Sequence, residues 1–311
     1  MKFAMVFPGQ GSQSVGMLAG YGDAPVIRQT LAEASDILKQ DVGRLMAEGP
    51  VEDLNSTVNT QPVMVVAGIC AWRAWRELGG AEPALLAGHS LGEYTALVAA
   101  GALSFSDALP LVRLRGRAMQ EAVPQGQGAM AAILGLDDEA VRAVCAEAAG
   151  SEVCEAVNYN APSQVVIAGH AGAVRRAMQV ARTRGAKRAV PLPVSAPFHS
   201  SLMAPAAARL CEALAKITVR APRIPVVHNV DAKGHADPDE IRTALVKQAD
   251  HAVRWVECVN EIAAQGVTHV FECGPGKVLA PLAKRIANGL QGLALVDRAT
   301  LASGAQLSKG V

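Results

Sequence analysis

A serine between two glycines is the residue best suited to chemistry in this chain. Residues 88–92 read Gly-His-Ser-Leu-Gly, after an apolar run over 84–87 and before a helix-like run over 95–100. The glycines permit a turn too tight for a Cβ, so a strand-turn-helix joint would present the Ser90 hydroxyl at the end of the strand. Unpaired N–H groups at the helix N-terminus would stabilise an oxyanion there. The pattern predicts a nucleophile, and an ordinary strand-turn-helix joint is the alternative.

A nucleophilic serine needs a base, and histidine suits that task near neutral pH. Of the seven histidines, His199 is the best candidate because it lies in the proline-containing loop over 194–200, directly after a predicted strand. Loops on rigid scaffolds are common places for sites. His89 adjoins the serine, but the tight turn would direct its side chain elsewhere. A surface or core position is the alternative for His199.

No acid occupies the place that an ordinary serine hydrolase would use. In those hydrolases the acid lies between the serine and the histidine in chain order. The acids in that window, over 107–155, fall at predicted helix starts or on helix faces. This weakens a lipase or esterase function and leaves a Ser-His dyad oriented by a backbone carbonyl as the alternative.

Arg115 is predicted on the apolar face of a helix. Arg117, by contrast, has polar neighbours three and four residues away and is expected to face solvent. A buried cation is costly without an anionic partner. Three roles are therefore open for Arg115. It forms a structural ion pair, or its guanidinium reaches water past the apolar neighbours, or it binds a substrate carboxylate through two hydrogen bonds. Its neighbours at helical spacing are all apolar: Leu111, Val112, Ala118 and Met119.

Composition excludes several classes of protein. The 311 residues are 50% hydrophobic and 18% charged, and the net charge of +1 gives no basic excess for nucleic acid. The longest apolar run, over 63–72, is too short to span a bilayer, and no signal peptide is evident. The six scattered cysteines indicate buried apolar positions in a reducing compartment. We expect a cytoplasmic monomer with no metal, cofactor, nucleic acid or membrane partner.

The alternation of predicted strands and helices indicates an α/β protein with a parallel central sheet covered on both faces. From residue 126 the order becomes β-α-β-β-α-β, the ferredoxin-like unit, which predicts a small inserted domain over 126–197. The predicted helix starts include the cap Asp23, the pair Gln61-Pro62, the cap Ser106, and residue 274 for a last helix ending near 286.

Seven motifs, taken in order, resemble the malonyl-CoA:acyl carrier protein transacylase family. The resemblance covers nearly the whole chain. It implies a hydrolase-like α/β core made of residues 1–125 and 198–311, with a ferredoxin-like subdomain over 126–197. The motifs lie at residues 7–13, 60–62, 88–94, 113–116, 157–162, 195–199 and 272–276.

The resemblance also implies a role for each candidate site residue. Ser90 would be the nucleophile, His199 its base, and Arg115 the group that binds the malonyl carboxylate. Phe198 is similar to the residue that selects malonyl groups in related acyltransferases, since a bulky ring leaves little room for an α-methyl branch. The remaining implied residues act through their backbones: the N–H groups of Gln10 and Leu91 as the oxyanion hole, and the carbonyl of Gln248 as the group that orients the histidine.

The activity implied by the resemblance is malonyl transfer from malonyl-CoA to the phosphopantetheine thiol of an acyl carrier protein, through a malonyl-serine ester, for fatty acid biosynthesis. No cofactor is implied, because malonyl-CoA is a substrate. Three alternatives stay open at this point. They are the malonyl-transfer subunit of a malonate decarboxylase, a serine thioesterase or hydrolase, and an inactive scaffold that binds a carrier protein.

Overall fold

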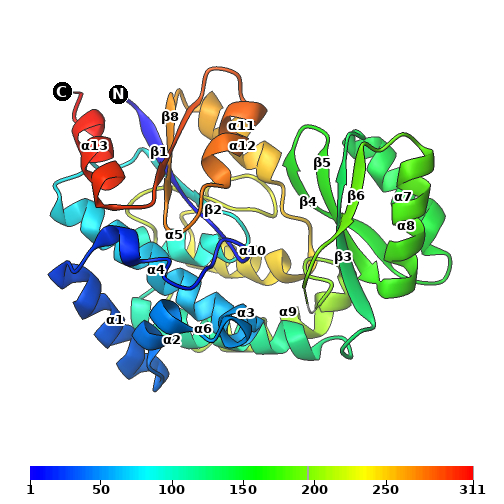
Figure 1. Cartoon of the computed structure of the whole chain (residues 1–311), viewed down its shortest axis with the longest axis horizontal. Helices are drawn as coiled ribbons and strands as arrows, with labels where there is room; N and C mark the ends of the chain where they lie inside the picture. The colour runs from blue at the N-terminus through cyan, green and yellow to red at the C-terminus, as the bar shows by residue number, and fades with distance from the viewer. Residues whose placement is uncertain (195, 311) are drawn as a thin grey trace.

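The computed structural model describes residues 1–194 and 196–310, which form an α/β fold with two separate sheets (Figure 1). The first sheet is parallel throughout, with the strand order β7-β2-β1-β8-β9. Its central strands are buried along their length, as strands covered on both faces must be. The strands are β1 (Phe3–Phe7), β2 (Leu85–Gly88), β7 (Val226–Val227), β8 (His269–Cys273) and β9 (Gln291–Leu295).

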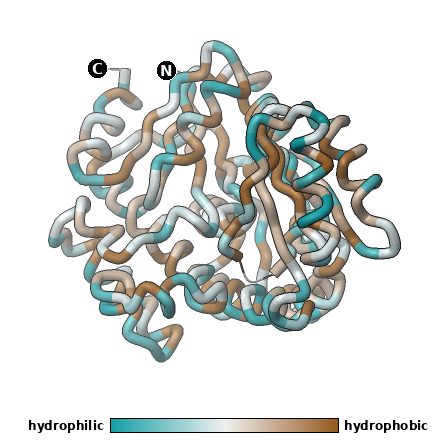
Figure 2. The backbone as a smooth tube through the Cα atoms, turned by 45° about the vertical axis from the view of Figure 1, so that its right-hand side comes forward, coloured by the Kyte–Doolittle hydropathy of each residue, from teal (hydrophilic) through white to brown (hydrophobic). Residues whose placement is uncertain are grey.

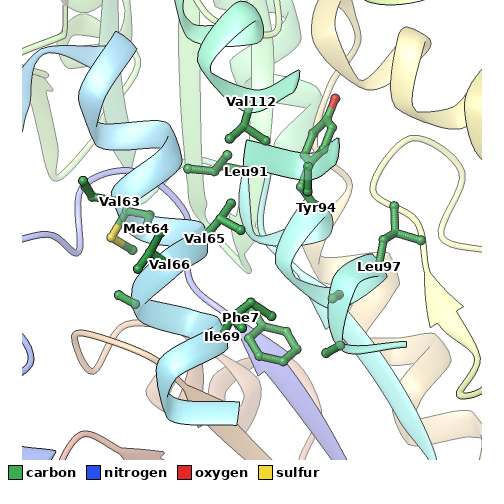
Figure 3. Close-up of a cluster of buried hydrophobic side chains, with 14 of the residues drawn as sticks. Phe7, Val63, Met64, Val65, Val66, Ile69, Leu91, Tyr94, Leu97 and Val112 are labelled. Atoms are coloured by element: carbon green, nitrogen blue, oxygen red, sulfur yellow. The ribbon is translucent and has the colours of Figure 1, made fainter. Parts of the chain in front are cut away.

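Helices cover both faces of the first sheet. Successive side chains of a strand point to opposite faces, so Met5 and Phe7 pack with α4 (Thr57–Glu77) and α5 (Gly92–Ala99). Figure 3 shows this packing, with side chains of both helices around Phe7. On the other face, Val6 packs with α11 (Trp255–Ala264) and α12 (Leu279–Ile286). The predicted parallel, doubly covered sheet is confirmed.

The second sheet is antiparallel, with the strand order β4-β5-β3-β6. In chain order its elements run β3, α7, β4, β5, α8, β6. The two helices cover one face of the sheet, and Met130 of β3 and Val166 of β5 pack on the other face against the main core. The elements are β3 (Gly128–Leu134), α7 (Asp138–Ala149), β4 (Cys154–Ala161), β5 (Gln164–His170), α8 (Ala171–Thr183) and β6 (Arg188–Pro191).

The remaining helices surround the first sheet and carry two further residues of the site described below, Arg115 and Gln248. They are η1 (Ala19–Tyr21), α1 (Pro25–Leu38), α2 (Val42–Glu48), α3 (Val51–Asn55), α6 (Phe105–Glu121), η2 (Ser201–Met203), α9 (Ala204–Leu214), α10 (Pro238–Asp250) and α13 (Arg298–Ser308). Hydrophobic stretches lie mainly in the strands and in the helix faces against them (Figure 2). None of the described helices is both long and apolar enough to cross a membrane.

Four predicted helix starts were wrong. The cap of α1 is Ala24 rather than Asp23, and the cap of α6 is Ser104, whose hydroxyl accepts a hydrogen bond from the Asp107 N–H at 2.9 Å. Packing of its buried face extends α4 back to Thr57, so Pro62 lies inside the helix. The positive φ angles of the two glycines over 274–276 delay the last predicted helix until α12 begins.

One cysteine also differs from expectation. Five of the six thiols are buried, whereas Cys211 on α9 is exposed. Its position on the outer side of an amphipathic helix explains the difference, because the buried face of α9 is formed by other residues, among them Leu210 and Leu214.

Candidate active site

The turn between β2 and α5 holds Ser90 in a backbone conformation that few residues adopt. Its φ is +52°. A Cβ on Gly88 would lie 1.9 Å from the carbonyl carbon of Gly92, and a Cβ on Gly92 would lie 2.1 Å from the carbonyl oxygen of Phe7. Both glycines are thus required by close backbone approach. The Ser90 N–H donates to Oδ1 of Asn229 at 2.6 Å, which leaves the hydroxyl free to face the site.

His199 lies against the serine hydroxyl. Ser90 Oγ and His199 Nε2 are 2.7 Å apart, and His199 Nδ1 is 2.7 Å from the backbone oxygen of Gln248. A carbonyl only accepts hydrogen bonds, so Nδ1 carries the proton and the lone pair of Nε2 faces the hydroxyl. Among the described residues no carboxylate contacts the ring. The sequence-based alternative of a dyad oriented by a carbonyl therefore has the geometry that it requires.

The surroundings keep the imidazole neutral. Burial lowers the pKa of His199 to about 3, and the charge of Arg115 contributes in the same direction, while the hydrogen bond to Gln248 opposes both. Desolvation and a nearby cation each disfavour the protonated ring. Near pH 7 the ring is therefore free to accept a proton from the serine.

Arg115 is a buried cation whose hydrogen-bond partners among the described residues are neutral. Its side chain is 2% exposed, as predicted from helical spacing, and Arg117 faces solvent. The guanidinium donates to Gln61 Oε1 at 2.9 Å, to Gln248 Oε1 at 3.0 Å and to Ser90 Oγ at 3.2 Å.

All hydrogen bonds that Arg115 donates within the described residues go to neutral groups, and its Nε has no hydrogen-bond partner there. Burial lowers the pKa of Arg115. The face of Tyr94 lies 5.4 Å from the guanidinium carbon and is a weak substitute for an anion. A desolvated cation with no anion beside it is suited to bind a carboxylate from outside the chain.

A cavity of about 120 Å³ joins these groups at the junction of the two sheets. Ser90, His199 and Arg115 line one side of it. The other side is an apolar wall from the second sheet and the loop after it, formed by Met130, Leu192, Val194 and Phe198. A larger cavity of about 620 Å³ shares several lining residues with the small one and extends it past α12. The arrangement suits a short acyl group on a long carrier.

Gln10 and Leu91 line the small cavity from two different segments of the chain. Leu91 lies at the N-terminus of α5, and Gln10 follows β1. No group within the described residues accepts a hydrogen bond from either backbone N–H. Two unpaired donors beside Ser90 could hold an oxyanion. The structure thus brings all six sequence-predicted site residues to one place.

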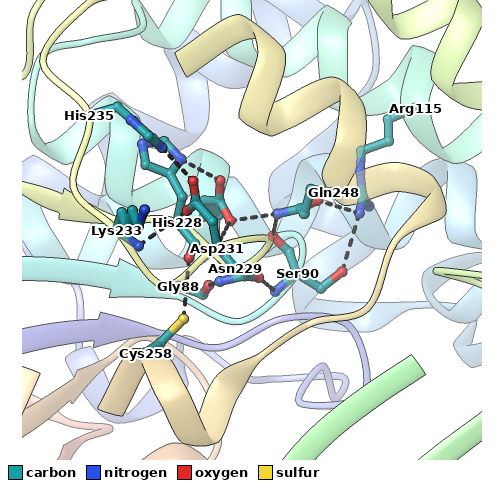
Figure 4. A network of polar contacts seen from close by, with 11 residues as sticks. Gly88, Ser90, Arg115, His228, Asn229, Asp231, Lys233, His235, Gln248 and Cys258 are labelled. Carbon is teal, nitrogen blue, oxygen red and sulfur yellow. Dashed lines mark hydrogen bonds and ion pairs between the residues drawn. The ribbon is translucent and has the colours of Figure 1, made fainter. Parts of the chain in front are cut away.

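Sequence reasoning missed three polar residues that hold the site together. Gln61 orients Arg115, Glu93 is a fully buried carboxylate behind the turn, and Asn229 binds the Ser90 N–H, as Figure 4 shows. Glu93 and Gln61 lie within the motifs at residues 88–94 and 60–62, so the sequence pointed to both positions. It did not indicate which residues their side chains contact. Asn229 follows β7 at the carboxyl end of a parallel strand, where sites commonly form, and this signal could have identified it.

His89 has a different environment, as the tight turn predicted. Its Nε2 lies 2.7 Å from Oδ1 of Asn160, and its ring packs 5.5 Å from the ring of Trp255. Burial lowers its pKa, so the ring is neutral. His89 therefore joins the turn to β4 and α11 and makes no contact with the serine hydroxyl.

Comparisons with known proteins identify one family. Residues 4–298 match the family described as "Acyl transferase domain". The chain is 54% identical to a "Malonyl CoA-acyl carrier protein transacylase" of Salmonella typhimurium, over 97% of this chain and 98% of that protein, and 52% identical to one of Escherichia coli, over 98% and 99%.

Solved structures give the same result. An acyl-carrier-protein S-malonyltransferase from Burkholderia pseudomallei is 61% identical, with a TM-score of 0.97 over 98% of this chain and all of that one. A malonyl-transacylase solved in complex with its type II polyketide acyl-carrier protein is 50% identical, also with a TM-score of 0.97, over 99% of this chain and all of that one.

Proposed function

This chain belongs to the malonyl CoA-acyl carrier protein transacylase family, and from that premise we propose that it transfers malonyl groups from malonyl-CoA to the phosphopantetheine thiol of an acyl carrier protein. The product would supply extender units for fatty acid biosynthesis. One observation carries the proposal: Arg115, a buried cation with no anionic partner among the described residues, donates to the hydroxyl of Ser90. A cation this close to a nucleophile fits an acyl group that ends in a carboxylate.

In the first half-reaction Ser90 Oγ attacks the thioester carbonyl of malonyl-CoA while its proton passes to His199 Nε2. The tetrahedral oxyanion accepts hydrogen bonds from the backbone N–H groups of Gln10 and Leu91. The carbon–sulfur bond then breaks, and the proton on His199 passes to the departing sulfur. CoA leaves as the free thiol, and a malonyl-serine ester remains.

In the second half-reaction the carrier's thiol gives its proton to His199 and its sulfur attacks the ester carbonyl. The same N–H groups hold the second oxyanion, and the proton returns from His199 to Ser90 as the ester oxygen leaves. The backbone carbonyl of Gln248 keeps the imidazole in one tautomer through both steps. The chemistry uses only side chains and backbone groups of the chain, so it requires no cofactor.

Arg115 acts differently from the other residues of the site. The malonyl carboxylate is present in substrate, transition state and ester alike, so its interaction with Arg115 strengthens binding and positioning rather than the chemical step itself. We therefore assign substrate selection to Arg115.

We also propose that residues 1–125 and 198–311 form a hydrolase-like catalytic core and that residues 126–197 form a ferredoxin-like subdomain. Support comes from the serine turn at the carboxyl end of a parallel strand, and from a four-stranded antiparallel sheet with two helices on one face. The subdomain would close the cavity over Ser90 with the side chain of Met130.

Intact-protein mass spectrometry after mixing with malonyl-CoA alone tests the function. We expect the wild-type chain to gain one malonyl group and to lose it when a phosphopantetheinylated acyl carrier protein is added. The Ser90→Ala variant should gain nothing. Release of CoA without an accumulated adduct would indicate a hydrolase instead, and an unchanged mass without CoA release would indicate an inactive scaffold.

A further inference from the structure

Glu93 is a fully buried acid with no assigned role. It lies in the first turn of α5, three residues after the serine, and its side chain is 0% exposed. Its Oε1 lies 2.8 Å from Nδ1 of His228. Its Oε2 accepts hydrogen bonds from the backbone N–H of Asn229 and from Nε2 of Gln248, both at 2.9 Å. A buried acid with this many hydrogen bonds has a fixed orientation.

The contact with Gln248 determines which way that amide points. Because Oε2 of Glu93 accepts the hydrogen bond, the NH₂ group of Gln248 must face the acid, and it also donates to the Ser90 carbonyl at 2.8 Å. The amide oxygen must then face the opposite way, where it accepts from Arg115 Nη2 at 3.0 Å (Figure 4). A flipped amide would place its NH₂ group against the guanidinium, donor against donor.

The same arrangement keeps the charge of Glu93 near Arg115 without contact. Burial lowers the pKa of Arg115, and the charge of Glu93 opposes that shift. A direct ion pair would occupy the guanidinium and compete with a substrate carboxylate. With one amide between them, the acid favours the charged form of Arg115 and leaves its outer edge open.

We propose that Glu93 is a positioning residue for substrate selection, which acts through the side-chain amide of Gln248 to hold Arg115 oriented toward Ser90 and free to bind the carboxylate of the acyl group. The proposal rests on the function proposed above. Glu93 touches no reacting atom. Its role differs from mere support of the serine turn, which Glu93 also contacts through Asn229.

The ratio of kcat/KM for malonyl-CoA to that for acetyl-CoA separates the two roles. Both substrates need Ser90 in the same position. Loss of support for the serine turn would therefore lower kcat/KM by the same factor for both and leave the ratio unchanged. Loss of Arg115 orientation affects only the substrate with a carboxylate. We expect Glu93→Gln to lower the ratio at least about tenfold, because the new amide can no longer accept all three hydrogen bonds.

Glu272→Gln is the matched control. Glu272 is also 0% exposed and also accepts backbone hydrogen bonds, from Val278 and Ala280, but it has no contact with Gln248 or Arg115. The same chemical change at equal burial should leave the substrate ratio at its wild-type value. A ratio that falls equally in both variants would assign the effect to buried acids in general and would overturn the proposal.

Gln248→Met supplies a second test that does not depend on folding of the Glu93 variant. It keeps the backbone carbonyl that contacts His199 and removes the amide between Glu93 and Arg115. We expect the same loss of ratio, and no further loss when both changes are combined, because they break one connection. If wild-type protein forms malonyl-serine and Gln248→Met retains the wild-type ratio, the role proposed for Glu93 is wrong while the proposed function stands. If wild-type protein forms no malonyl-serine, the proposed function fails.

Discussion

The hydroxyl of Ser90 and the imidazole of His199 lie 2.7 Å apart, and both residues hold left-handed backbone conformations, with φ of +52° and +64°. Each such residue costs about 1 kcal/mol or more relative to ordinary backbone. This strain persists because other contacts fix both segments: Asn229 binds the backbone of Ser90, and the carbonyl of Gln248 binds the ring of His199. The pair is thus aligned by the fold before any substrate arrives.

The first prediction concerns the glycine before the turn. Gly88→Ala would place a Cβ 1.9 Å from the backbone of Gly92, which cannot move without displacing α5 from β1. We expect a loss of more than about 3 kcal/mol in the free energy of unfolding, measured by urea denaturation. Gly126→Ala is the control, because no atom lies within 4 Å of the added Cβ there, and its only cost is the backbone strain of a side chain at a φ of +82°. Its loss should be near 1 kcal/mol. Equal losses in the two variants would contradict the steric argument.

Periodic patterns explain what the sequence could predict. Helical spacing correctly identified Arg115 as buried and Arg117 as exposed, because neighbours on one helix face are local in the chain. The glycines of the serine turn are equally local. By contrast, Ser90 and Asn229 are 139 residues apart, and no periodicity reports that one binds the other. The polar support of the site therefore emerged only from the structure.

Two of the missed elements, at the end of the chain, have weak hydrophobic patterns. Strand β9 lies at the edge of the first sheet and its first two residues are exposed, so it lacks a buried run that would mark it. Helix α13 has small and polar residues on most positions and buries few large side chains. Tertiary packing fixes β9, whereas α13 begins at a capping box between Asp297 and Thr300, a local signal that the sequence-based prediction overlooked when it ended near residue 286.

The second prediction follows from the pKa of His199, which burial lowers from 6.5 to about 3. Between these pH values the unfolded chain binds a proton that the folded chain does not, so stability must fall as the pH is lowered through this window. From pH 7 to pH 4.5 the loss due to this residue is roughly 2–3 kcal/mol. His199→Asn removes the titration and tolerates a positive φ. Denaturation at the two pH values should show a smaller loss of unfolding free energy in the variant than in the wild type. Identical losses would contradict the lowered pKa of His199.

The third prediction concerns the apolar wall. Phe198→Ala enlarges the cavity beside Ser90, which makes room for an α-methyl branch. A single methyl group changes discrimination by about 10- to 200-fold. We therefore expect methylmalonyl-CoA loading to rise at least tenfold relative to malonyl-CoA. Phe105→Ala removes another buried ring, which packs under Arg73 and does not line the cavity. It should destabilise the fold without changing the ratio, and a change in both variants would refute selection by Phe198.

The fourth prediction tests the cation itself. Arg115→Ala removes the only group within the described part of the chain that presents a buried positive charge to the Ser90 hydroxyl. We expect the preference for malonyl over acetyl thioesters to disappear, mainly through an increase in KM for malonyl-CoA. Arg115→Lys should not restore it, because an ammonium group cannot reach Gln61 and Gln248 together with the forked geometry of a guanidinium. Arg117→Ala, two residues along the same helix but exposed, should keep the wild-type preference. A variant lacking Arg115 that still discriminates as the wild type does would require another residue to bind the carboxylate.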